Sequence, residues 1–223
     1  MCGRFTQQRP TSELAEIFDA EDRVDAPGER YNVAPTDEAA VVVQRDDQRA
    51  VMAYRWGLIP HWAENRKVGS RMFNARAETI GRSPAFRYAL DRRRCVVPVD
   101  SFYEWRREGS VRQPFRVARA DGLPLALAGL WAGWRDPETD EVVRSFSIIT
   151  GEPTEAVRQL HDRMPIVLVE EEWPHWLDPA TEPGELQALI QPREALDLLI
   201  YPVSRLVNDV RKDGPELIEP LAG

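Results

Sequence analysis

The residue with the most distinctive chemistry in this chain is Cys2, which directly follows Met1. A small residue at position two normally allows Met1 to be removed, which leaves a free α-amine and a thiol on adjacent carbons of Cys2. The amine has a reference pKa of ~7.7–8.0, so a useful fraction is neutral at neutral pH. Such a 1,2-aminothiol forms an imine with an aldehyde, and its sulfur then closes a five-membered thiazolidine. Both nucleophiles are tethered, which favours ring closure.

A cysteine at position two is, on its own, most simply an incidental small residue. Here it is accompanied by several motifs in a fixed order along the chain. They are Met-Cys-Gly-Arg-Phe (1–5), Arg-Tyr-Asn-Val-Ala-Pro (30–35), Trp-Gly-Leu-Ile-Pro (56–60), Asn-Ala-Arg-Ala-Glu-Thr (74–79), Phe-Tyr-Glu-Trp (102–105) and His-Asp-Arg-Met-Pro (161–165). Pro-Val-Ser (202–204) and Val-Asn (207–208) follow near the C-terminus.

Together these motifs resemble the SOS response-associated peptidase (SRAP) family, whose members are abasic-site processing proteins, and the resemblance spans nearly the whole chain. It implies binding of single-stranded DNA and a thiazolidine crosslink between the mature N-terminal cysteine and the ring-opened deoxyribose of an abasic site. This is lyase-like Schiff-base chemistry. The family name reflects removal of the residue before the cysteine, which looks autocatalytic. The implied fold is α+β, built around a barrel-like β core.

Proton transfers are needed to open the closed sugar and to form the imine, and a carboxylate and an imidazole suit them. Glu104 is flanked by aromatic residues, and an apolar environment would raise its pKa toward neutrality. His161 could protonate the sugar oxygen. Taken alone, Glu104 reads as a surface residue near Arg106 and Arg107, and His161 as a structural one. The resemblance favours catalytic roles for both.

Asn74 offers an amide that could orient the α-amine or hold the sugar without adding charge. Its alternative is a turn or helix-cap residue, since it precedes a possible short helix. The resemblance again favours a role in the site, so the predicted catalytic set is Cys2, Asn74, Glu104 and His161.

Three arginines are candidates for the phosphates that flank the lesion: Arg4, Arg76 and Arg163. Arg76 could instead pair with Glu78, and Arg163 with Asp162. Loss of a phosphate contact would weaken binding to all sequences and lower its salt dependence.

Trp62, with Ile59 and Pro60, is a candidate wedge against the bases beside the lesion, because stacking tolerates any sequence. Core packing is the alternative. Family members often show two adjacent aromatic residues here, whereas His61 precedes Trp62 in this chain.

Composition limits these hypotheses. The 223-residue chain carries a net charge of −8, so DNA binding would need a local basic cleft. Two cysteines are too few for a disulfide framework and fit a reducing cytosol, and Cys95 lies in an apolar run typical of a core. Three scattered histidines predict no metal site, and no cofactor motif is present. With no signal core or apolar span, we expect a cytoplasmic monomer, nucleoid-associated if prokaryotic, without membrane contact.

Two further hypotheses stay open. The first is a cysteine peptidase in which the α-amine of Cys2 serves as base for its own thiol, with removal of Met1 as its reaction. The second is a non-covalent single-stranded DNA-binding module, which requires no reactive cysteine.

The elements that would position these residues suggest one α+β domain over residues 1–223, mature from Cys2, with a mostly antiparallel, barrel-like sheet and short peripheral helices. Hydrophobic periodicity and turn residues predict helices at 11–20, 85–90, 154–160, 170–177 and 184–190. They predict strands at 39–44, 50–56, 95–99, 115–118, 125–131, 142–150, 166–169 and 198–203. Residues 21–29 are expected to form a loop.

Overall fold

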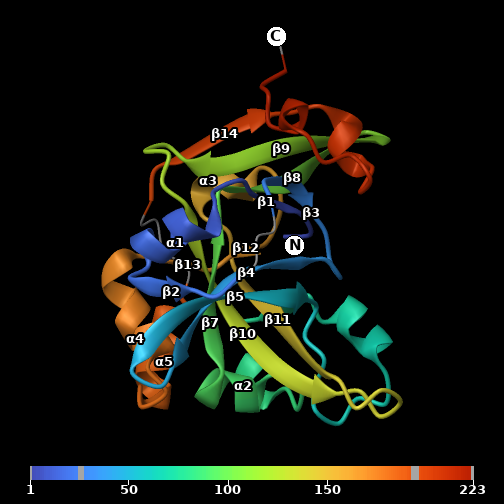
Figure 1. Cartoon of the computed structure of the whole chain (residues 1–223). Coiled ribbons are helices and arrows are strands. Elements are labelled where there is room, and N and C mark those ends of the chain that lie inside the picture. The colour runs from blue at the N-terminus through green and yellow to red at the C-terminus, as the bar shows by residue number, and fades with distance from the viewer. Residues whose placement is uncertain (1, 25–27, 192–195, 222–223) are drawn as a thin grey trace.

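Five strands close into a β-barrel in the computed structural model, which describes residues 2–24, 28–191 and 196–221 (Figure 1). The barrel strands are β4 (Glu38–Arg45), β5 (Gln48–Trp56), β7 (Arg94–Val99), β10 (Leu125–Arg135) and β11 (Val142–Gly151). Antiparallel pairing runs from β5 through β4, β7 and β10 to β11. Parallel pairing of β11 with β5, at Phe146 opposite Trp56, then closes the ring. Closure leaves these strands without free edges.

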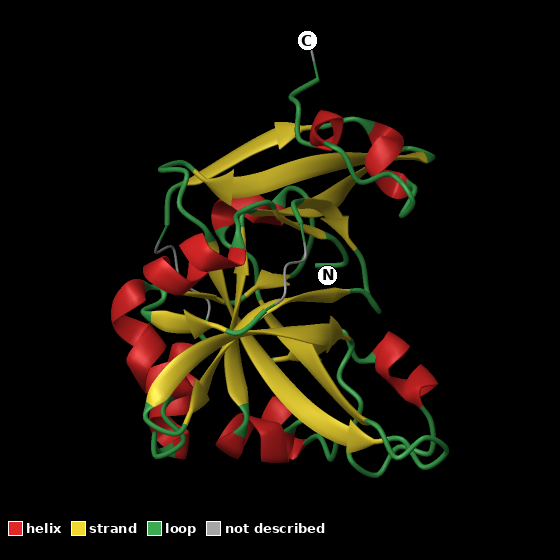
Figure 2. Cartoon of the chain, viewed as in Figure 1, coloured by secondary structure: helices red, strands yellow, loops and turns green. Residues whose placement is uncertain are grey.

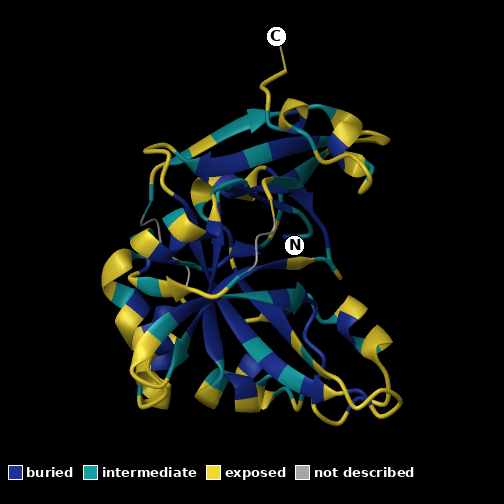
Figure 3. Ribbon diagram, in the orientation of Figure 1, coloured by how far each residue is buried: buried dark blue, intermediate teal, exposed yellow. Residues whose placement is uncertain are grey.

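Alternate residues of the barrel strands belong to two different apolar clusters. Along β10, Ala126, Ala128 and Leu130 pack in the cluster that includes the helices, whereas Leu125 and Leu127 pack in the cluster that includes the N-terminal strand. This period-2 alternation is what a strand buried on both faces requires. Figure 3 shows the result, a largely buried set of central strands beneath more exposed helices.

Short helices cover the outside of the barrel, as Figure 2 shows. Helices α1 (Thr11–Ile17), α4 (Trp173–Leu177) and α5 (Pro183–Leu189) contribute apolar side chains to the first cluster. Helix α2 (Arg87–Arg92) contacts β7 and β10, and α3 (Glu155–Arg158) follows β11. The 3₁₀ turns are η1 (Arg66–Arg71), η2 (Ile80–Arg82), η3 (Glu170–Glu172), η4 (Arg205–Asn208) and η5 (Pro215–Leu217).

A second, antiparallel sheet lies over one end of the barrel (Figure 1). Its order is β14 (Leu198–Pro202), β9 (Val111–Arg119), β8 (Ser101–Glu108), β1 (Phe5–Gln7) and β3 (Arg30–Val33). Phe5, Phe102 and Phe115 from this sheet pack in one cluster with barrel residues, so the two sheets share a core. The remaining strands are β2 (Ala20–Asp22), β6 (Asn74–Arg76), β12 (Met164–Pro165) and β13 (Val167–Leu168), which pair with barrel strands.

The C-terminal segment is fastened to β3 through Asn32 and Asp213. The Asn32 side-chain amide donates to the carbonyls of Val207, Asp209 and Lys212 at 3.3, 3.1 and 2.8 Å. The Asp213 carboxylate accepts from the amide N–H groups of Tyr31 and Asn32 at 2.5 and 2.9 Å. The buried Asn32 therefore ties the 30–35 motif to the Val-Asn motif at 207–208.

The predicted α+β class with a barrel-like core and short peripheral helices is confirmed. Several boundaries differ: the helix expected at 85–90 begins at Arg87, and the strand expected at 166–169 is shortened to β13, with the separate two-residue strand β12 before it. The loop expected at 21–29 is wrong at its start, because Glu21 and Asp22 lie in β2, and residues 25–27 of that range fall outside the described residues. No helix in the described part of the chain is long and apolar enough to cross a membrane.

Candidate functional site

The pairing of β1 with β8 brings Cys2 toward Glu104. Phe5 lies opposite Phe102, and the Tyr103 amide donates to the Arg4 carbonyl at 3.0 Å. Side chains alternate along β8, so Phe102 and Glu104 point to the face that holds Cys2, while Tyr103 packs on the other face. Both groups are buried: Cys2 is 0% exposed and Glu104 1%. A thiol and a carboxylate therefore share one enclosed environment.

Burial sets the protonation of both groups. It raises the pKa of Glu104 to about 7, so acid and carboxylate forms coexist at neutral pH. Burial also raises the pKa of the Cys2 thiol, and the nearby Glu104 charge raises it further. The thiol is consequently protonated at neutral pH, and its Sγ lies 3.8 Å from the Arg4 carbonyl oxygen. Its use as a nucleophile requires a base.

Asn74 holds the backbone of Cys2. It begins β6, where it pairs in parallel with Ile148 of β11, and its Nδ2 donates to the Cys2 carbonyl at 2.7 Å. Its Oδ1 is buried and accepts no hydrogen bond from the described residues, which leaves an acceptor for a ligand. The expectation that Asn74 precedes a short helix is wrong, because the residue starts a strand.

His161 follows α3, and its Nδ1 has two neighbours. The Arg163 amide donates to this nitrogen at 3.1 Å, while an oxygen of the Asp162 carboxylate lies 2.7 Å from it. The first contact needs a bare Nδ1 and the second a protonated one. Burial lowers the pKa of His161 against the opposing effect of Asp162, which favours the neutral ring. In that form Nδ1 accepts from Arg163 and the ring proton lies on Nε2.

Arg163 and Arg76 differ in how far their charges are neutralised within the protein. The Arg163 guanidinium donates to both oxygens of Glu78, at 3.1 and 2.9 Å, and to the Thr150 carbonyl at 2.6 Å. Arg76 pairs with Thr150 across β6 and β11, is exposed, and forms no ion pair within the described residues. The alternative pairings expected from sequence are therefore wrong: Glu78 binds Arg163, and Asp162 lies against His161.

Arg4 is half-buried and bound to the C-terminal segment. Its guanidinium donates to the Val207 carbonyl at 2.9 Å and to Asn32 Oδ1 at 3.4 Å, and burial lowers its pKa. The contact between Arg4 and Val207 is not predicted from the sequence. The Val-Asn motif at 207–208 marks the right segment, but only the fold shows that the Val207 carbonyl accepts from Arg4.

Trp62 is 51% exposed, which rules out core packing for its side chain. The two residues expected beside it in a wedge do not share this exposure. Ile59 is fully buried, with its amide donating to Ser145 Oγ at 2.8 Å, and Pro60 is also buried. The turn is thus anchored at one end and presents Trp62 outward, so a wedge would consist of Trp62 without Ile59.

The fold and this arrangement define a class: a β-barrel protein in which a cysteine at position two is enclosed with a carboxylate and an amide, and the strand that carries the amide also carries an exposed arginine. The chain belongs to the SOS response associated peptidase (SRAP) family, whose model matches residues 1–210. It is 41% identical to the abasic site processing protein YoqW of Bacillus subtilis over 98% of this chain and 99% of that protein. It is 30% identical to the abasic site processing protein YedK of Escherichia coli over 99% and 100%. A crystal structure from Bacteroides thetaiotaomicron superposes with a TM-score of 0.90 at 25% identity, covering 99% of this chain and all of that one.

Proposed function

We propose that this protein captures abasic sites in single-stranded DNA through a covalent thiazolidine at Cys2, after loss of Met1. The observation that carries the proposal is the enclosure of Cys2 with Glu104 while Asn74 holds its carbonyl. The names of the relatives support a role in processing abasic sites. The mature chain then begins at Cys2 and acts as one domain that shields the lesion during repair.

The reaction begins with opening of the deoxyribose ring. His161 in its protonated form donates its Nε2 proton to the ring oxygen as the ring C–O bond breaks, while a base takes the anomeric hydroxyl proton, which yields the aldehyde. The neutral α-amine of Cys2 then attacks the aldehyde carbon. The resulting carbinolamine loses its hydroxyl as water, with the proton supplied by Glu104 in its acid form, and the nitrogen then returns its own proton to the Glu104 carboxylate, so that a neutral imine remains.

Ring closure follows at the same carbon. The sulfur of Cys2 bonds to the imine carbon, the thiol proton passes to the Glu104 carboxylate, and the imine nitrogen receives a proton in return. The balance is one amine, one aldehyde and one thiol giving one thiazolidine and one water. Since a pKa of about 7 lets Glu104 both donate and accept, the same residue serves the forward steps and their reversal.

The DNA strand is held by side chains around the enclosed Cys2. Arg76, exposed and without a carboxylate partner in the described chain, supplies the phosphate contact with the least competition from the protein. Arg163 and Arg4 contribute charge while they keep their contacts to Glu78 and Val207. Trp62 stacks on a base beside the lesion.

A denaturing gel tests the proposal. Purified protein is incubated with a single-stranded oligonucleotide that carries one abasic site, beside an intact oligonucleotide and the Cys2→Ala variant. We expect a heat- and SDS-resistant band only with abasic DNA and Cys2. Its absence, with loss of Met1 verified by mass, would refute covalent capture and leave the peptidase and the non-covalent binding module as the remaining functions.

Retention of Met1 after Glu104→Ala would assign its removal to the protein itself. Loss of Met1 in that variant would instead assign removal to a separate aminopeptidase. The intact mass of each purified protein distinguishes the two.

A further inference from the structure

A groove of about 430 Å³ lies between helix α2, the turn at 58–62 and strand β10, away from Cys2. Its walls include Pro60, His61, Tyr88, Arg93 and Trp131. The volume lies in the range of small-molecule sites. Tyr88 is 56% exposed, so one aromatic face of the groove is open to a ligand.

Arg93 lies over two aromatic rings in this groove. Its guanidinium carbon is 5.3 Å from the centre of the Tyr88 ring and 5.2 Å from that of Trp131. Cation–π contacts of this kind hold the guanidinium in place without using its N–H groups as donors. Within the described residues the Arg93 side chain has no carboxylate partner and donates no hydrogen bond to the protein.

The neighbouring Arg94 has a structural role and provides a comparison with Arg93. It is 3% exposed, and its guanidinium donates to the backbone carbonyls of Leu90, Asp91, Trp176 and Asp178. Four of the five N–H donors of Arg94 are therefore used by the fold. The N–H groups of Arg93 are left for a ligand that carries acceptor oxygens.

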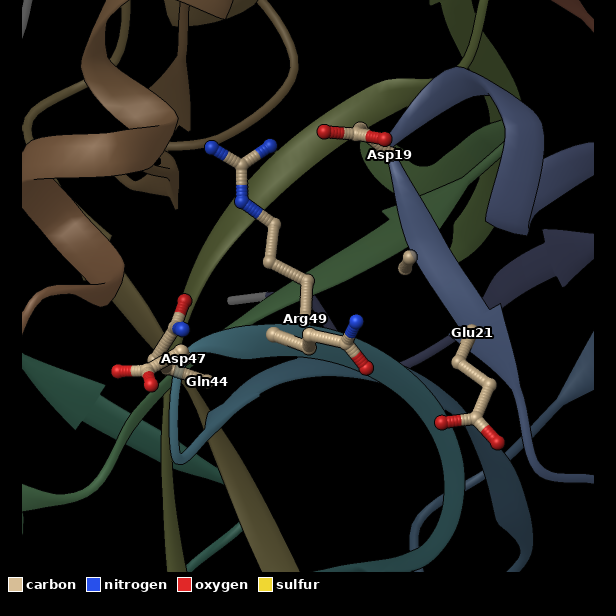
Figure 4. Close-up of a pocket in the computed structure, with 7 residues that line it drawn as sticks. Asp19, Glu21, Gln44, Asp47 and Arg49 are labelled. Atoms are coloured by element: carbon tan, nitrogen blue, oxygen red, sulfur yellow. The ribbon is translucent and has the colours of Figure 1, made fainter.

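Charge favours an anionic ligand in this groove. The chain has a net charge of −8, yet the described residues that line the groove include no carboxylate. A hollow at the other side of the barrel is the opposite case: Asp19, Glu21 and Asp47 line it together with Arg49 (Figure 4). A phosphate is repelled there, whereas nothing in the described lining of the α2 groove opposes one.

The groove also continues from the proposed DNA site. His61 forms part of its wall, and the next residue is the exposed Trp62. A DNA strand with a base stacked on Trp62 would reach Tyr88 and Arg93 in this groove by continuing past His61.

We infer that this groove is a second nucleotide subsite for the same DNA strand, in which a base stacks on Tyr88 and its phosphate pairs with Arg93. The inference rests on the proposed function, because it extends the strand that Cys2 captures. Stacking on an aromatic ring combined with an arginine contact to phosphate is the usual mode of sequence-independent single-strand binding.

Anisotropy titrations in the full-length Cys2→Ala protein test the subsite. Lesion-centred oligonucleotides of about five and about fifteen nucleotides bracket the ~4–16 nucleotide sites of single-strand binders. We expect Tyr88→Leu to weaken binding of the longer strand by about fivefold or more, and Tyr88→Phe to preserve it. Arg93→Ala should lower the salt dependence of that binding by about 0.7 in the log–log slope, as for one lost phosphate. Binding of the short strand should not change.

Arg92→Ala is the matched control, because Arg92 is an exposed arginine on the same helix that does not line the groove. Equal effects of Arg92→Ala and Arg93→Ala, or titrations of the long strand that Tyr88→Leu does not alter, would overturn the subsite. A protein or peptide would then be the better occupant of the groove.

Photocrosslinking places the nucleotide directly. A series of oligonucleotides carries iodouracil at increasing distances from the abasic site. Each is crosslinked to the wild-type protein, and the crosslinked peptides are identified by mass spectrometry. A crosslink to Tyr88 or Trp131 at one defined position supports the subsite. If Cys2 captures the lesion normally and no position reaches either ring, the inference fails alone; if no oligonucleotide is captured at Cys2, the proposed function fails.

Discussion

The surroundings of Cys2, the proposed nucleophile, differ from those of Cys95, which lies among apolar side chains. Both thiols are fully buried and free, and burial raises the pKa of each. Cys95 lies in β7 among apolar side chains, facing Gly129, where an added Cβ would meet its Sγ at 2.8 Å. Cys2 instead has Glu104 and Asn74 beside it.

Burial therefore does not distinguish the two sites, and neither thiol is activated by a lowered pKa. The difference is a route for protons. Glu104, with a pKa of about 7, can exchange a proton with Cys2, whereas burial alone determines the pKa of Cys95. The proposed reactivity of Cys2 thus depends on the buried polar neighbours of its thiol, and the predictions below test each neighbour.

The largest difference is expected between the two cysteines themselves. Cys2→Ala should abolish the DNA crosslink, because the sulfur that closes the ring is lost. Cys95→Ala should retain it, since Cys95 contacts no polar site residue. Crosslink yield on a denaturing gel measures both. A Cys95→Ala protein that remains folded by circular dichroism but does not crosslink would show that the reactive thiol has been misassigned.

Glu104→Gln should slow crosslinking by about 10³-fold, within the range of lost general acid–base catalysis. The amide keeps the size of the side chain but cannot carry the proton between thiol and imine. Quench-flow or timed gel sampling gives the rate, with Arg106→Gln on the same strand as control. A rate within tenfold of wild type would remove Glu104 from the mechanism.

Glu104 should also make stability depend on pH. Its pKa is about 7 in the folded protein against 4.5 for the ordinary side chain, so the folded state holds a proton that the unfolded state releases between these values. The contribution of Glu104 to stability should therefore be largest below about pH 4.5 and be lost as pH rises to 7, by up to about 3 kcal/mol. Urea denaturation from pH 4 to 8 measures the difference between wild type and Glu104→Gln, which should widen in favour of the variant as pH rises. A difference that does not change with pH would contradict the raised pKa.

Asn74→Ala is expected to have the smallest of these effects, a loss of about tenfold in crosslink rate. The variant removes the donor that holds the Cys2 carbonyl, at a cost of about 1.4 kcal/mol for one hydrogen bond. Timed crosslinking at saturating DNA isolates this positioning effect from binding. Asn74→Asp provides the comparison, because it keeps the side-chain shape but lacks the donor.

Much of the architecture could be predicted from sequence, because the barrel strands are long and apolar enough to show their periodicity. The strands that carry the site could not. β6 has three residues and no measurable alternation, so local pattern offers only a turn or a helix cap as the structural alternative for Asn74. β8 includes Glu104, two arginines and a second glutamate, and it carries too much charge to read as a buried strand.

Pairing across the fold was also beyond local reasoning. The sequence motifs contain Arg163 and Glu78 separately, and local reasoning offers only nearby partners as alternatives: Asp162 for Arg163 and Arg76 for Glu78. The fold instead joins these two residues, 85 positions apart, because β6 and β12 both pair with the end of β11. The motifs gave the membership of the site, and the sheet topology gave its contacts.

The link between Arg4 and the Val207 carbonyl has a consequence for the timing of synthesis. The N-terminus leaves the ribosome first, but the residue that fastens it is made 203 positions later. The contact that fastens Arg4 is therefore among the last to form around Cys2. If it is needed to enclose Cys2, a ribosome-stalled chain that ends before Val207 should remain a substrate for a separate aminopeptidase.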